Sequence, residues 1–104
     1  MQVQVNHDNH VWVGVEVAER LAQVVESSLA HFGNRITRVE VHLADENAGK
    51  GGEADKRCVL EARLAKLQPI AVTHQAGTLQ LALEGALDKL DHALGHALGR
   101  LQTN

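Results

Sequence analysis

The residues whose types and spacing come closest to a metal site lie in the last third of the chain. Asp88, His92 and His96 recur every four residues within a predicted helix, and two histidines four residues apart can share a zinc ion. The intervening sequence lacks the helper glutamate of a metalloprotease, and the three side chains fall opposite a stripe of leucines. We therefore expect a polar outer face that contacts water, and we predict no metal site.

Two further features resemble reactive or ligand-binding motifs without completing them. Cys58 lies on the apolar side of a predicted strand, where a buried, unreactive thiol is expected rather than a nucleophile. Gly49, Gly51 and Gly52 surround Lys50, but the Gly-Lys-Ser/Thr ending of a phosphate-binding loop is missing and the pattern that follows is not helical. We interpret this segment as a flexible hairpin loop.

A pair of glycines offers a second kind of contact. Gly95 and Gly99 are four positions apart in the predicted final helix, and small residues at this spacing allow close approach between helices. The helix is too polar for a membrane, so the pair predicts, as an alternative to plain exposure, a contact with another chain. A homodimer is therefore one expected arrangement.

Basic side chains supply the chemistry for binding phosphate. Those in the middle of the chain are Arg35, Arg38, Lys56, Arg57, Arg63 and Lys66. Arg57 and Arg63 project from one face of a predicted strand and Arg38 projects similarly from its neighbour, so we expect them on the open face of a sheet or at its rim. Glu40 and Glu61 lie between them, and cross-strand ion pairing is the alternative to RNA binding.

The distribution of charge limits where such binding can occur. Ten Lys and Arg against 13 Asp and Glu give a net charge of −3, which is not the basic excess typical of nucleic-acid-binding proteins. Residues 1–34 carry −3, residues 35–66 carry +1 and residues 67–104 carry −1. Phosphate contacts are therefore expected mainly from the middle third.

Length and composition exclude several classes of protein. A chain of 104 residues with 44% hydrophobic residues has the size of one globular domain, over 1–104. A single cysteine excludes an internal disulfide, and no apolar run approaches the ~20 residues of a membrane span. The start of the chain has no signal-peptide pattern, so we expect a cytoplasmic protein without membrane partners. An aromatic content of 2% argues against a stacking platform for single strands.

The hydrophobic periodicity predicts six elements. Apolar residues alternate at 2–6, 36–44 and 56–65, which is typical of strands. A helical pattern runs over 14–32, with Val17, Leu21, Val24, Val25 and Leu29 among its apolar residues and Gly33 as a stop. Residues 70–74 read as a fourth strand, and a leucine stripe predicts a long amphipathic helix over 78–101 despite Gly85, Gly95 and Gly99.

These elements assemble into one predicted fold. The order is β-α-β-β-β-α, and a right-handed crossover places the first two strands in parallel. The strands at 36–44 and 56–65 form an antiparallel hairpin, and each has one apolar and one charged face, so helices should cover only one side. The prediction is an α+β two-layer sandwich, with a four-stranded mixed sheet and two helices on one face.

Three strings within this order carry a resemblance to a known family. They are ITRVEVHL at 36–43, KRCVLEAR at 56–63 and ALEGALDKL at 82–90. Together with the element order they resemble the bacterial hibernation-promoting factor and protein Y family (ribosomal subunit interface proteins), in its short form. The resemblance extends over about residues 2–101 and implies a single hibernation-factor-like (dsRBD-like) domain.

The resemblance also implies a function. Members bind the small ribosomal subunit in the RNA channel, silence idle ribosomes by steric blocking in stationary phase or stress, and are neither enzymes nor users of cofactors or small-molecule substrates. The resemblance and the strand pattern together predict an RNA-binding set of Arg35, Arg38, Lys56, Arg57, Arg63 and Lys89. Residues 91–101 contain only one basic residue, Arg100, where the family is lysine-rich. A fold repurposed for protein–protein interaction or dimerisation is therefore the alternative.

Overall fold

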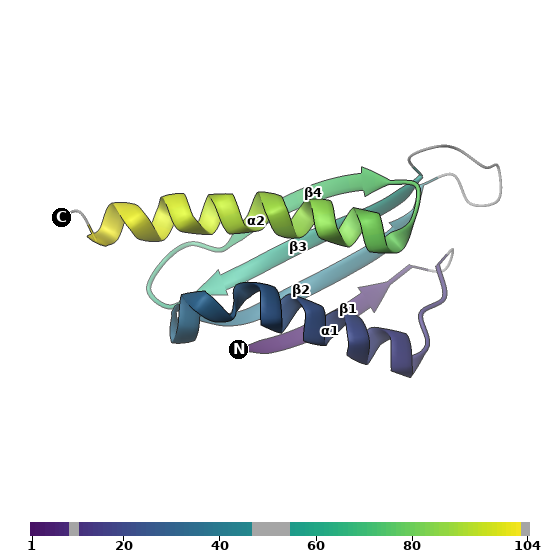
Figure 1. The fold of residues 1–104 in the computed structure, drawn as a ribbon, viewed down its shortest axis with the longest axis horizontal. Helices are drawn as coiled ribbons and strands as arrows, with labels where there is room; N and C mark the ends of the chain where they lie inside the picture. Colours follow the sequence, from purple (N-terminus) through teal and green to yellow (C-terminus); the bar gives the residue numbers. More distant parts are fainter. Residues whose placement is uncertain (9–10, 47–54, 103–104) are drawn as a thin grey trace.

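The computed structural model describes residues 1–8, 11–46 and 55–102 of the chain. The predicted order of strands and helices is confirmed (Figure 1). The elements are β1 (Gln2–His7), α1 (Val15–Leu29), a short 3₁₀ segment η1 (Ala30–Arg35), β2 (Ile36–Asp45), β3 (Lys56–Leu64), β4 (Ile70–Ala76) and α2 (Leu79–Gln102). The glycines around Lys50 lie outside the described residues, so their predicted loop conformation stays a prediction.

The sheet is mixed, as predicted. Its strand order is β1-β2-β3-β4, with β1 parallel to β2 and the other neighbours antiparallel. Both helices lie on the same face of the sheet and both begin at the same end of it (Figure 1). The α+β two-layer sandwich predicted from the sequence is therefore confirmed, and one face of the sheet is left open.

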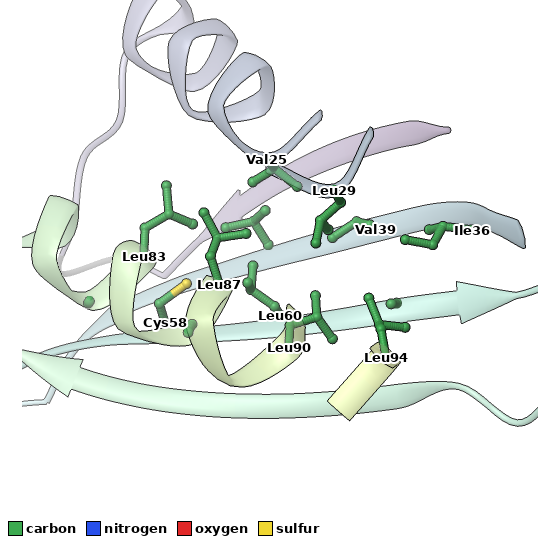
Figure 2. Packing of buried hydrophobic residues seen from close by; sticks show 14 of the residues in the cluster. Val25, Leu29, Ile36, Val39, Cys58, Leu60, Leu83, Leu87, Leu90 and Leu94 are labelled. Atoms are coloured by element: carbon green, nitrogen blue, oxygen red, sulfur yellow. The ribbon is translucent and has the colours of Figure 1, made fainter. Parts of the chain in front are cut away.

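The buried face of the sheet and the leucine stripe of α2 form one core. Val39, Val41 and Leu43 of β2 alternate with outward side chains, and so do Cys58 and Leu60 of β3. Figure 2 shows Leu83, Leu87, Leu90 and Leu94 of α2 directed at these strands. Each fully buried leucine contributes roughly 1.5–3 kcal/mol, so the stripe outweighs the three glycines, each of which costs the helix about 1 kcal/mol relative to alanine.

The first helix departs from its predicted form in two ways. It ends at Leu29, and the chain continues to Arg35 as a tighter 3₁₀ segment rather than as an α-helix to Phe32. Gly33 adopts a φ of 64°, which turns the chain toward β2. Val17 and Val24, two of the apolar residues in the predicted helical pattern, are 42% and 40% exposed. Val11 and Val13, which precede the helix, are part of the core.

The fourth strand, whose faces the sequence leaves open, directs His74 toward α2. Ile70, Val72, His74 and Ala76 are half-buried, whereas the residues between them are exposed. A Cβ added at Gly85 would lie 2.5 Å from Cγ of His74 and closer still to Cδ2 and Nε2. Gly85 therefore leaves the space that the imidazole ring occupies between β4 and α2.

Candidate nucleic-acid interface

Three of the predicted RNA-binding residues, Arg38, Arg57 and Arg63, point away from the core on the open face. They alternate with buried neighbours along β2 and β3, which agrees with the expected one-sided sheet. The strand register places Arg38 directly opposite Arg63 and Glu40 directly opposite Glu61. Like charges directly opposite each other are destabilising, so the energy of this face depends on contacts between neighbouring pairs.

Those contacts form an ion-pair network. Arg63 Nη2 lies 3.4 Å from Glu40 Oε2 and 3.5 Å from Glu61 Oε1, and Arg38 Nε lies 3.8 Å from Glu40 Oε2. Arg38 also donates a hydrogen bond to the Gln4 side chain of β1. The side chains of Arg38 and Arg63 are 39% and 54% exposed and that of Glu40 is 16% exposed, so these are partly exposed pairs, each worth on the order of 1 kcal/mol. The cross-strand ion pairing that the sequence analysis gives as the alternative to RNA binding is therefore present. Pairs of this strength can be replaced by a contact with phosphate.

Lys56 and Arg57 lie at the other end of the same strands and are held more closely. Lys56 Nζ lies 3.2 Å from Asp45 Oδ2 and 3.1 Å from Asp55 Oδ1, and hydrogen bonds to these carboxylates raise the pKa of Lys56 above its ordinary 10.5. Asp55 is itself only 5% exposed. Arg57 Nη1 lies 3.0 Å from Glu46 Oε1. The Lys56 ammonium is thus part of the fold, because it neutralises a buried carboxylate.

The remaining two predicted residues bind carbonyl groups. Arg35 Nε donates to the Phe32 carbonyl at 3.1 Å, and Lys89 Nζ donates from α2 to the Thr73 carbonyl of β4 at 2.8 Å. No carboxylate pairs with either group within the described residues. A carbonyl partner leaves the positive charge uncompensated, so both side chains keep their full charge for a phosphate.

The structure therefore divides the predicted set among three places. Arg35, Arg38 and Arg63 lie where β2 begins and β3 ends, and Lys66, which follows β3, joins them because Ala65 N–H donates to the Arg35 carbonyl at 3.0 Å. We call these four residues the basic end of the sheet. Against Glu40 and Glu61 they carry a net charge of +2. Lys66 belongs to the basic residues singled out in the sequence but not to the predicted RNA-binding set, and the pairing of β2 with β3 brings it beside Arg35.

The opposite end of the sheet is acidic. Lys56 and Arg57 meet Asp8, Asp45, Glu46 and Asp55 there, for a net charge of −2. Lys89 stands apart from both ends, beside β4. The six predicted residues thus do not form one patch. One end of the sheet is positive and the other is negative, although the charges of the two ends cancel.

The structure also places the other chemical features that the sequence singles out. Asp88, His92 and His96 are exposed, and no three potential metal ligands gather anywhere in the part of the chain that the structure describes. Cys58 is buried, and desolvation raises the pKa of its thiol to about 12. No atom lies within 4 Å of a Cβ added at Gly95 or Gly99, so the predicted contact with a second chain stays a prediction. None of the described helices is long and apolar enough to cross a membrane.

Two solved structures share this architecture. The N-terminal domain of Thermus thermophilus Protein Y superposes with a TM-score of 0.72 at 14% identity, over 92% of this chain and 98% of that one. A ribosomal subunit interface protein from Coxiella burnetii gives a TM-score of 0.71 at 13% identity, over 95% of this chain and 99% of that one. At such identities the likeness establishes the fold alone.

Comparison at the level of sequence separates individual relatives from the family. No curated protein matches the chain significantly. Residues 9–102, by contrast, match the family described as Sigma 54 modulation protein / S30EA ribosomal protein. This match spans most of the chain and agrees with the resemblance carried by the strings in β2, β3 and α2. The chain therefore belongs to the Sigma 54 modulation protein / S30EA ribosomal protein family.

Proposed function

We propose that this chain binds the RNA channel of the small ribosomal subunit and silences idle ribosomes by steric blocking. Family membership supports the ribosome as the partner. The observation that carries the RNA contact is the basic end of the sheet, where Arg35, Arg38, Arg63 and Lys66 meet. Lys89 adds a separate cation on α2.

The mechanism needs positioning rather than catalysis. A phosphate that approaches Arg38 or Arg63 competes with the carboxylates of Glu40 and Glu61, which lie 3.4–3.8 Å from the guanidinium nitrogens. Each of these ion pairs is worth on the order of 1 kcal/mol. The guanidinium groups of Arg38 and Arg63 can therefore leave their carboxylate partners for an RNA phosphate with little loss of folding free energy. We propose a cytoplasmic, non-enzymatic factor without a cofactor, acting in stationary phase or stress.

Sedimentation with ribosomes through sucrose gradients tests this proposal. Four phosphate contacts predict a slope of log K against log salt of about −3 to −4, which is on the order of 100-fold weaker binding between 50 and 200 mM salt. We expect comigration with the small subunit at low salt and loss at the higher salt. Wild-type protein that stays at the top of the gradient at low salt refutes the proposal.

Matched charge reversals locate the interface. Arg35→Glu with Lys66→Glu changes the basic end, and Arg20→Glu with Arg57→Glu makes the same change in net charge on α1 and at the acidic end. We expect the first pair to abolish comigration and the second to reduce it by less than about threefold, because distant exposed charges are screened. Equal loss in both pairs would contradict the assignment to the basic end.

The alternative is an interaction domain without RNA binding. One observation favours it: α1 and α2 together carry −3, the net charge of the whole chain. It predicts a dimer or a specific complex that is insensitive to the charges of the basic end. A wild-type chain that stays at the top of the gradient, together with a dimer or complex that persists in the Arg35→Glu, Lys66→Glu variant, would support it.

A further inference from the structure

The two helices enclose a groove on the covered side of the sheet. Ser28 and His31 approach α2 from one side, and Leu87, Asp88, Asp91 and His92 face them across a depression of about 360 Å³. His31 Nε2 lies 3.0 Å from Asp91 Oδ1 and joins the two sides. α1 and α2 start at the same end of the sheet and lie on the same face of it (Figure 1), so each helix continues from this depression toward its own N-terminus.

The wall formed by α1 is apolar. Val17, Leu21, Val24 and Ser28 are separated by four, three and four residues, which places them in one row along the helix. Ser28 lines the depression, so the row faces the groove. Val17 and Val24 are 42% and 40% exposed. The structure thus leaves an apolar row partly uncovered next to α2.

The wall formed by α2 is acidic. Glu84, Asp88 and Asp91 are separated by four and three residues and form a second row. Asp88 and Asp91 line the depression, and Glu84 is exposed one turn before them. On α1, Glu16, Glu19 and Glu26 lie outside the apolar row, and Glu26 lines a different depression together with Met1 and Val3. Phosphate groups of RNA would be repelled by the acidic wall of α2, whereas lysine or arginine side chains would be attracted.

We propose that this groove docks a basic segment of a ribosomal protein, with apolar side chains against Val17 and Val24 and cationic side chains against Glu84 and Asp88. The inference rests on the proposed ribosome association and adds a second contact to it. The basic end of the sheet contacts RNA, and the groove contacts protein on the helix side. Binding of one chain then uses both chemical components of the ribosome.

Charge reversal gives a test whose sign identifies the occupant. Glu84→Lys with Asp88→Lys reverses the acidic wall, and Glu16→Lys with Glu19→Lys makes the same change in net charge outside the apolar row of α1. All four side chains are exposed, so both variants should fold, as their far-ultraviolet circular dichroism would verify. We expect the groove variant to bind small subunits about 10-fold more weakly in the sedimentation assay, and the control to bind them as tightly as the wild type or more tightly.

The other results each overturn the inference. Tighter comigration of the groove variant would identify RNA as the occupant, and equal behaviour of the two variants would show that only net charge matters. A wild-type chain that does not comigrate with small subunits would refute the proposed function itself. A wild-type chain that comigrates, with a groove variant that behaves like the control, would refute only the docking groove. Independently, a photo-crosslinking amino acid at Val24 should join the chain to a ribosomal protein, with Thr73 on the open face as the control position. Crosslinks from Val24 to RNA alone, or none with bound subunits, refute protein docking.

Discussion

The contact between Gly85 and His74 leads to a prediction about a substitution that helix propensity alone would favour. Gly85→Ala adds a methyl group at 2.5 Å from Cγ of His74 and nearer to two other ring atoms. The ring stems from β4 and is half-buried under α2, so it has to move or α2 has to lift. Alanine gains about 1 kcal/mol in propensity, whereas overpacking of this kind costs about 1–3 kcal/mol. We expect a net destabilisation of up to about 2 kcal/mol.

The same helix provides the matched control. Gly95→Ala has the same gain in propensity, and no atom lies within 4 Å of the added Cβ, so we expect stabilisation by about 1 kcal/mol. In thermal unfolding followed by circular dichroism, Gly95→Ala should raise Tm by roughly 4–8 °C, and Gly85→Ala should lower it by up to about 16 °C.

A double substitution isolates the contact. In Gly85→Ala with His74→Ala the obstructing ring is gone, so the Gly85→Ala change should become neutral or stabilising relative to His74→Ala alone. A Gly85→Ala variant that is as stable as Gly95→Ala would refute the reasoning, because it would mean that the space beside His74 is not needed. A double variant without coupling would refute it equally.

Three further predictions concern groups inside the fold. The thiol of Cys58, with a pKa of about 12, should react with Ellman's reagent at about pH 8 only as fast as the chain unfolds, and at once in denaturant; immediate reaction of the native chain would contradict its burial. Because the pKa of Lys56 is raised on folding, its stabilisation is complete below the unfolded pKa near 10.5 and lost as the pH rises through the folded value. Urea unfolding above that pH should show this loss, which Lys56→Met should reduce; tyrosine ionisation does not interfere, since the chain has none. Leu90→Ala, at a fully buried position, should cost about 2–5 kcal/mol in the same assay, and a loss below about 1 kcal/mol would argue against the core of Figure 2.

Periodicity predicted the elements well because burial on one side imposes it. Val39, Val41 and Leu43 alternate since β2 packs on helices with one face only, and the leucines of α2 recur because one side of that helix meets the sheet. Periodicity does not tell which residue of another element lies opposite. The meeting of His74 with Gly85 and the pairing of Arg38 with Arg63 depend on strand register and helix placement, and neither is encoded in local spacing.

For the candidate site as well, the sequence predicts the residue types but not how these residues are grouped in space. Residue types identified the cations, and the glutamates between them identified ion pairing as the competing interaction. The division into a basic and an acidic end was not predictable, because Asp45 and Asp55 approach Lys56 only once β2 and β3 are paired in this register. Lys66 gained its place beside Arg35 for the same reason.

The hydrogen bond from Lys89 to Thr73 also affects how copies of the chain meet each other. β4 is an outer strand of the sheet, and the unpaired backbone groups of such a strand are a template for a second chain. The Lys89 ammonium donates to the Thr73 carbonyl of this strand and places a positive charge beside it. Edge-to-edge pairing along β4 would therefore bring two like charges together. The charge of Lys89 therefore disfavours sheet extension and aggregation along β4.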